Sequence, residues 1–148
     1  MSTNTSFRVR CAAAVAALGI AGAVLATPAT AAPNSFPLNV GQETTGSNTG
    51  ASGKFSYTID GGELCYTLSA RNLSVDAVAA HVHVAPRHVD GPIVIPLSVG
   101  AGTSFTVSDC VPADADVLAD LDANPRSYYV NVHTPTFPGG EIRGQFTH

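Results

Sequence analysis

The chain has 148 residues, the length of a single domain, with 7 basic and 11 acidic residues and a formal net charge of −4. Because this composition offers no basic stripe to neutralise phosphates, we expect no nucleic-acid partner.

The N-terminus has the pattern of a secretory signal peptide. Arg8 and Arg10 precede an uncharged apolar run of 16 residues, 11–26, and small residues then lead to a cleavage site after Ala31, with Ala32 as the near alternative. A membrane-spanning helix needs about 20 apolar residues, so a retained anchor is not favoured. We therefore expect a secreted protein without a membrane attachment after cleavage. Its net charge would be −6, since cleavage removes two of the 7 basic residues and leaves 5 against 11 acidic ones.

The sequence after the signal peptide, which we assign to residues 1–31, divides into two parts. Residues 32–52 are rich in Gly, Ser, Thr and Asn and are predicted to form a flexible N-terminal segment with one short strand near Phe36–Val40. Residues 53–148 are predicted to form the folded domain.

Period-2 patterns then predict the strands of that domain in order. The first two form a hairpin around Asp60-Gly-Gly62, and the next, 77–85, places Val78, Ala80, Val82 and Val84 on one face and His81 and His83 on the other. Further strands are predicted at 93–97, where Pro96 favours a sheet edge, at 103–108, and in a closing hairpin over 128–133 and 141–146.

One segment has a helical pattern instead. Val117, Leu118 and Leu121 are spaced for a helix within 112–123, and Asn124-Pro125 would end it. The sequence thus predicts an all-β fold, an antiparallel β-sandwich or partly closed barrel of about seven to eight short strands with one short helix.

Of the three cysteines, Cys11 would leave with the signal peptide, and Cys65 and Cys110 would remain as a single pair. In an oxidising compartment we predict a disulfide between them, and the alternative is two free thiols.

Polar residues occupy the face of the strands opposite the apolar one and are predicted to point outward. They are His81, His83, Tyr129, Asn131, His133, Glu141, Arg143 and Gln145. If strand 77–85 lies beside strand 128–133, His81, His83 and His133 would converge as a ligand set that Cu²⁺ or Zn²⁺ accepts. In the alternative interpretation, Tyr129, Asn131 and Glu141 hold these histidines for structural reasons only.

Glu141 and Arg143 share one face and could form an ion pair or orient a histidine, and the alternative is a solvated cross-strand pair of little energetic value. His88 falls in a turn and His148 at the C-terminus, so neither strengthens a metal site. We assign no catalytic residue, because the sequence has no nucleophile motif and no glycine-rich phosphate loop. An enzyme of this sequence would have to depend on a metal ion.

Two sequence strings resemble the closing motif of the chordin (CHRD) domain family. They are Tyr128-Tyr-Val-Asn-Val-His-Thr134 and Pro138-Gly-Gly-Glu-Ile-Arg-Gly-Gln145. Upstream, Leu64 to Tyr66, His81 to His83 and Gly91-Pro92 are similar to the preceding strands of that family, so the resemblance spans roughly residues 50–147. A weaker similarity links His81-Val-His83 to a copper-ligand strand of copper/zinc superoxide dismutases, whose zinc-loop pattern has no match here.

The resemblance implies a bacterial secreted single-domain member of a family that also occurs in animal chordin, an extracellular antagonist of bone morphogenetic proteins. A growth-factor partner is not implied, because the chain lacks the cysteine-rich modules of chordin. We expect a non-catalytic extracellular module that binds a protein or envelope component. The alternative is a copper- or zinc-binding protein, or a metal-dependent enzyme, that uses His81, His83 and His133.

Overall fold

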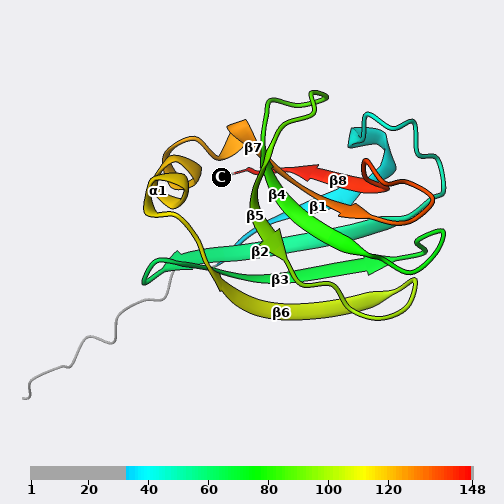
Figure 1. Ribbon diagram of the computed structural model, residues 1–148, viewed down its shortest axis with the longest axis horizontal. Coiled ribbons are helices and arrows are strands. Elements are labelled where there is room, and N and C mark those ends of the chain that lie inside the picture. The colour runs from blue at the N-terminus through cyan, green and yellow to red at the C-terminus, as the bar shows by residue number, and fades with distance from the viewer. Residues whose placement is uncertain (1–32, 148) are drawn as a thin grey trace, which may run out of the picture. The chain divides into compact units, whose positions relative to one another are not determined.

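The computed structural model describes residues 33–147, so the predicted signal peptide and His148 lie outside the described part of the chain. Eight strands, one α-helix and two short 3-10 helices make up this part (Figure 1). In chain order they are β1 (Asn34–Asn39), η1 (Val40–Gln42), β2 (Ser52–Asp60), β3 (Glu63–Arg71), β4 (Ala79–Val84), β5 (Ile93–Leu97), β6 (Phe105–Pro112), α1 (Ala115–Ala123), η2 (Pro125–Ser127), β7 (Tyr128–His133) and β8 (Ile142–Gln145).

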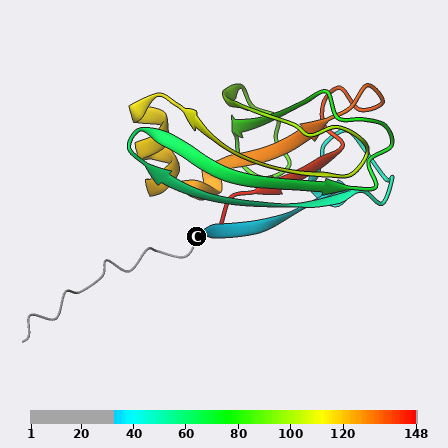
Figure 2. The same cartoon turned by 90° about the horizontal axis from the view of Figure 1, so that it is seen from below.

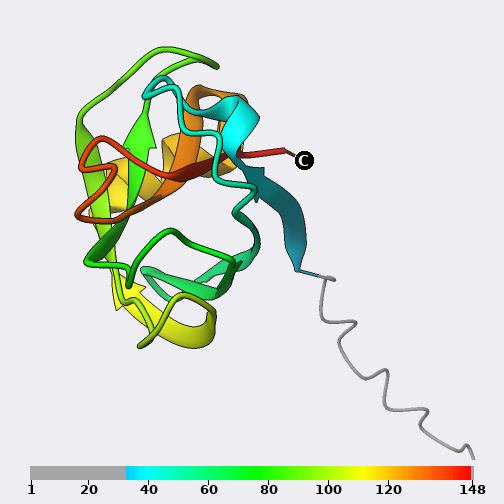
Figure 3. The same ribbon diagram turned by 90° about the vertical axis from the view of Figure 1, so that its right-hand side faces the viewer.

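All eight strands belong to one antiparallel sheet with the order β5-β4-β7-β8-β1-β2-β3-β6. The sheet curls around the core into a nearly closed barrel, as the end-on view shows (Figure 3). β5, the strand that contains Pro96, lies at one edge of the sheet, as predicted, because proline cannot donate a ladder hydrogen bond. The predicted all-β antiparallel fold is confirmed.

The predicted hairpin joins β2 and β3, whose register runs from Ser52 opposite Arg71 to Asp60 opposite Glu63. Its two turn residues, Gly61 and Gly62, have φ values of +58° and +87°. Both residues of this two-residue turn therefore need the left-handed conformation that glycine adopts without steric cost.

The core fills the interior of the barrel with side chains from every strand except β6, whose apolar residues are only partly buried. Its centre is an aromatic cluster in which Phe146 packs 4.9 Å from the rings of both Phe36 and Tyr57. Helix α1 covers one end of the barrel with Leu118 and Leu121 (Figures 1 and 2). This arrangement buries the apolar face that the period-2 patterns predicted.

One predicted core residue is not in the core. Val78 is 61% exposed, because β4 begins only at Ala79 and Val78 belongs to the loop before it. The inward-facing side of β4 therefore begins at Ala80 and not, as the sequence pattern predicted, at Val78.

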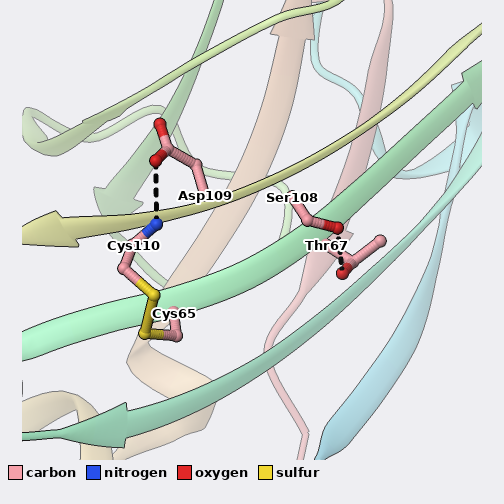
Figure 4. The surroundings of a disulfide bond; sticks show 5 residues. All are labelled: Cys65, Thr67, Ser108, Asp109 and Cys110. Atoms are coloured by element: carbon pink, nitrogen blue, oxygen red, sulfur yellow. Dashed lines mark hydrogen bonds between the residues drawn. A yellow bond between two sulfur atoms is a disulfide. The ribbon is translucent and has the colours of Figure 1, made fainter.

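The predicted disulfide is confirmed and links Cys65 of β3 to Cys110 of β6 (Figure 4). These residues stand directly opposite each other in the ladder, two positions from the hydrogen-bonded pair of hydroxyls of Thr67 and Ser108, 2.7 Å apart. The bridge thus fastens β6, an edge strand, to the rest of the sheet.

The segment before residue 53 is part of the same fold. β1 pairs with β2 over its whole length, and Phe36 and Leu38 enter the core. After β1, Gln42 of η1 accepts a hydrogen bond from the backbone of Gln145 on β8, and Thr49 in the following loop donates to Glu141. The sequence pattern placed the start of the domain at residue 53, because this loop has the polar composition of an exposed segment and gives no sign that it packs against the sheet. Within the described residues, no helix has the length and apolar character to cross a membrane.

Candidate functional site

The three candidate histidines lie on neighbouring strands. β4 pairs with β7 in an antiparallel register that sets His81 opposite Asn131 and Ala79 opposite His133. His81, His83 and His133 therefore share the outer face of the sheet, where each offers a ring nitrogen and these nitrogens all lie within 4.8 Å of one another. The structure thus has the strand adjacency on which the predicted convergence depended.

Backbone carbonyls fix the orientation of two of the rings. His83 Nδ1 lies 2.8 Å from the carbonyl oxygen of Gly91, and His133 Nδ1 lies 2.9 Å from that of Pro138. Because a carbonyl oxygen only accepts, both Nδ1 atoms carry the proton, and the Nε2 atoms are unprotonated. This is how metal-binding histidines are held in proteins.

The third ring completes the group. His81 Nδ1 lies 2.9 Å from His133 Nε2, so His81 donates to the lone pair of His133. His83 Nε2 is buried and has no hydrogen-bond partner among residues 33–147. A buried acceptor without a partner is costly, so this atom is a position where a ligand would be stabilised.

All three imidazoles are neutral at physiological pH. Burial, followed by the proximity of His133 and His83, lowers the pKa of His81 to about 4. Burial also lowers the pKa of His83 and of His133, although their hydrogen bonds to Gly91 and Pro138 act in the opposite direction. The neutral imidazole is the form that binds metal ions.

A stack of three side chains supports His83 from behind. The ring of Tyr129 lies parallel to that of His83, with centroids 4.7 Å apart and an interplanar angle of 5°. The guanidinium carbon of Arg143 lies 3.4 Å from the centroid of the Tyr129 ring on the next strand. The stack limits the rotation of His83.

Arg143 holds the loop between β4 and β5 against the sheet. Its Nη1 and Nη2 donate to the carbonyl oxygens of Val89 and Pro86, both at 3.0 Å. Asp90, 72% exposed, lies 3.9 Å from Nη1. Burial lowers the pKa of this fully buried arginine. Since Gly91 lies in the same loop, Arg143 indirectly positions the carbonyl that orients His83.

Glu141 holds a second set of loops. Its carboxylate accepts four hydrogen bonds of 2.7–2.8 Å, from the backbone and hydroxyl of Ser74 and from the hydroxyls of Thr49 and Thr134. Burial alone would raise the pKa of Glu141, but these hydrogen bonds outweigh it and the pKa is lowered. Thr134 directly follows His133, so Glu141 anchors the end of that strand.

The predicted polar face differs from the observed one in its exposure. Its residues do point away from the core, but all except His81 and Gln145 are buried, among them His83 at 6% and His133 at 8% exposure. The predicted solvated pair is also wrong, because Glu141 and Arg143 are both fully buried and each is bonded to loops. The loops between the strands pack over this face, and the alternation of residues within a strand cannot predict how loops pack.

Sequence reasoning missed Glu43 and Gly140. Glu43 lies in the loop after η1, is 9% exposed, and reaches the outer face beside Asn131. Gly140 has a φ of +130°, and a Cβ atom there would lie 2.3 Å from Glu43 Oε1. The Pro138-Gly-Gly-Glu string was the available signal, because consecutive glycines mark a close approach of other groups.

The remaining candidates do not join this group. His88 is exposed in the turn after β4, with a φ of +60°, and His148 lies outside the described residues. A second group of potential ligands, Glu63, Cys65 and Cys110, has both its sulfur atoms in the disulfide. The three histidines on β4 and β7 therefore form the candidate metal centre.

Comparison with known proteins agrees with the fold and with the sequence strings around the site. Neither the curated proteins nor the solved structures gave a match. A family model, the CHRD domain, matches residues 35–146, which include every strand except the first residue of β1. The chain therefore belongs to the CHRD domain family.

Proposed function

We propose that this protein is a secreted CHRD-domain protein that binds a Cu²⁺ or Zn²⁺ ion through His81, His83 and His133. The observation that carries the proposal is the buried Nε2 atom of His83, which has no hydrogen-bond partner in the described chain. His83, His81 and His133 each offer a ring nitrogen, and these nitrogens lie within 4.8 Å of one another. The ligand atoms would be Nε2 of His83, Nε2 of His133 and Nδ1 of His81, and the His81 ring would change tautomer so that its proton moves from Nδ1 to Nε2.

The spacing of the nitrogens supports a shared ion. Two metal–nitrogen bonds of about 2.05 Å hold their nitrogens about 2.9 Å apart at a right angle and about 3.3 Å apart at a tetrahedral angle. The His81 and His133 nitrogens are already 2.9 Å apart. Small side-chain shifts would bring His83 into the same shell, since no pair in the group is more than 4.8 Å apart.

The chemistry of the site also favours a metal over a purely structural role. Imidazole is a ligand that suits both Cu²⁺ and Zn²⁺. The lowered pKa values of the three histidines mean that protons do not compete with the ion at neutral pH. A set of histidines held only for structure would be expected to satisfy the buried acceptor of His83.

Secretion is supported by the signal-like N-terminus and by the disulfide. The bridge between Cys65 and Cys110 is stable in oxidising compartments and rare in reducing ones. The three-histidine set would leave at least one coordination position for water or another ligand. Redox and hydrolytic assays should therefore follow once an ion has been shown to bind.

The test is calorimetric titration of the metal-stripped mature chain with Cu²⁺ and with Zn²⁺. We expect one ion per chain, and a loss of affinity of more than about 100-fold in the double variant His81→Ala/His133→Ala. The matched control is His88→Ala, which removes an exposed histidine outside the group and should leave binding unchanged. Circular dichroism would verify that each variant is folded.

Two outcomes would contradict the proposal. One is the absence of stoichiometric binding to the wild-type chain, and the other is an equal loss of affinity in His88→Ala and in the double variant. Either result would redirect the search to an extracellular protein or envelope component as the partner.

A further inference from the structure

Glu43 is a buried carboxyl group whose hydrogen-bonding capacity is only partly used. It is 9% exposed, and its Oε1 atom has no hydrogen-bond partner within residues 33–147. The absence of a side chain at Gly140 leaves room for this atom, since a Cβ atom at residue 140 would lie 2.3 Å from Glu43 Oε1. Glu141, the other buried carboxyl of this face, is by contrast saturated by four hydrogen bonds. Glu43 is therefore the buried carboxyl that can still change its protonation state at low cost.

Asn131 connects Glu43 with the histidine group. It lies on β7 directly opposite His81, and its Nδ2 donates to the carbonyl oxygen of Gly139 at 3.1 Å. Asn131 Nδ2 and Glu43 Oε1 both lie within 3 Å of the position that a Cβ atom on Gly140 would take, and β7 carries Asn131 alongside β4, the strand of His81 and His83. Asn131 Oδ1 is a further buried acceptor for which the described residues provide no donor. The unsatisfied acceptors of Glu43, Asn131 and His83 thus belong to neighbouring residues on the outer face of the sheet.

Two charged side chains face Glu43. Arg143 on β8 is fully buried and positive, and Asp90 in the loop between β4 and β5 is exposed and negative. Tyr129 on β7 is neutral, because burial raises its pKa. The charges of Arg143 and Asp90 therefore oppose each other around Glu43, and an added positive charge would favour the ionised form of its carboxyl group.

We infer that Glu43 is the counter-charge of the metal centre: it holds a proton in the metal-free protein and releases it to solvent when the ion binds. This inference rests on the proposed function. In the step, the carboxylic acid of Glu43 loses one proton to become a carboxylate, and an ion with a charge of +2 is bound by three neutral imidazoles. A divalent ion beside the buried Arg143 needs such a compensating negative charge.

The protonation state of Glu43 supports the inference. Burial raises the pKa of Glu43 to about 7, although Arg143 acts in the opposite direction. With this pKa, a group that becomes fully ionised on binding would release more protons at pH 6.5 than at pH 8. The three histidines, whose pKa values are lowered, are present in both the wild type and Glu43→Gln, so the difference in proton release between these two chains reports on Glu43.

The experiment counts protons during metal binding. Calorimetric titrations with Zn²⁺ at pH 6.5 and pH 8, in buffers of different ionisation enthalpy, give the number released per ion. We expect the wild-type chain to release more protons per ion at pH 6.5 than at pH 8, and we expect Glu43→Gln, which keeps the shape of the side chain, to release fewer than the wild type at pH 6.5. The matched control Glu63→Gln changes an exposed glutamate of β3 and should release as much as the wild type.

A second measurement on the wild-type chain is independent of how well the variant folds. Infrared difference spectra at pH 6.5 should show the loss of a protonated-carboxyl band when Zn²⁺ is added. Binding without proton release, or equal release from the wild type and Glu43→Gln, would overturn this inference and leave the metal site standing. The absence of binding to the wild type would overturn the metal site itself.

Discussion

Replacing Glu141 with glutamine is expected to destabilise the protein, although the two side chains have nearly the same shape. The carboxylate accepts four hydrogen bonds from three segments that are distant in sequence, through Thr49, Ser74 and Thr134. A glutamine oxygen could keep the two bonds now made to Oε1. The amide nitrogen would then face the hydroxyls of Ser74 and Thr134, which would have to turn from donors into acceptors.

The magnitude follows from these contacts. Hydrogen bonds to a charged acceptor contribute about 1.5–3 kcal/mol and neutral ones about 0.5–1.5 kcal/mol, so weakening two bonds costs about 1–2 kcal/mol. The Thr134 hydroxyl already accepts from the backbone of Phe137, so a second donor leaves its own proton unsatisfied at a cost of about 1 kcal/mol. We expect a total loss of about 2–3 kcal/mol in the free energy of unfolding, a large part of the stability of a typical domain.

Urea denaturation at pH 7 measures this loss, and Glu63→Gln on the exposed surface of β3 is the control that should change stability by less than about 0.5 kcal/mol. The pKa of Glu141 is lowered in the folded state, so its contribution is present above the pKa of the unfolded chain and is lost as the pH falls through the folded value. The difference between wild type and Glu141→Gln should therefore shrink at acidic pH. A Glu141→Gln protein as stable as the control at pH 7 would refute the reasoning.

Three further predictions concern pH, the disulfide and the glycine of the closing motif. Because the folded-state pKa of His81 is lowered to about 4, its contribution to stability is complete above pH 6.5 and is lost as the pH falls towards 4; the urea midpoint should fall over this range, and less so in His81→Gln. The bridge joins residues 45 positions apart, so its removal in Cys65→Ser/Cys110→Ser should lower the free energy of unfolding, measured with urea, by up to about 4 kcal/mol. The metal affinity measured by calorimetry should stay unchanged, because the bridge connects β3 and β6 and not the strands of the histidines. Gly140→Ala would force a side chain into a backbone with φ of +130° and onto Glu43, so we expect a loss of about 1–3 kcal/mol in thermal or urea unfolding; a variant of unchanged stability would contradict the close approach.

Most of the fold could be predicted because its strands face a core on one side only. The alternation of Leu64, Tyr66 and Leu68 predicts both a strand and its buried face, and the two consecutive glycines at 61 and 62 predict the turn. The alternation in β4 misled at Val78, where the strand has not yet begun. The order of the strands could not be read from the sequence, since pairing partners depend on how all eight strands close around the core.

The candidate site could be predicted only in part. His81, His83 and His133 stand out by type and parity, and their convergence needed one assumption, the adjacency of two strands. Burial of the site depends on loops whose polar composition resembles that of exposed segments. Glu43 lies in such a loop, so its position beside Asn131 becomes visible only in three dimensions.

The stack of His83, Tyr129 and Arg143 has an optical consequence. The chain contains no tryptophan and four tyrosines, so its ultraviolet emission comes from tyrosine alone. One of the four, Tyr129, has its ring parallel to a proposed ligand at a centroid separation of 4.7 Å. A paramagnetic Cu²⁺ ion bound to His83 should quench Tyr129, whereas Zn²⁺ should not. The protein thus carries its own fluorescent indicator of which ion occupies the site, and Tyr129→Phe would isolate that signal.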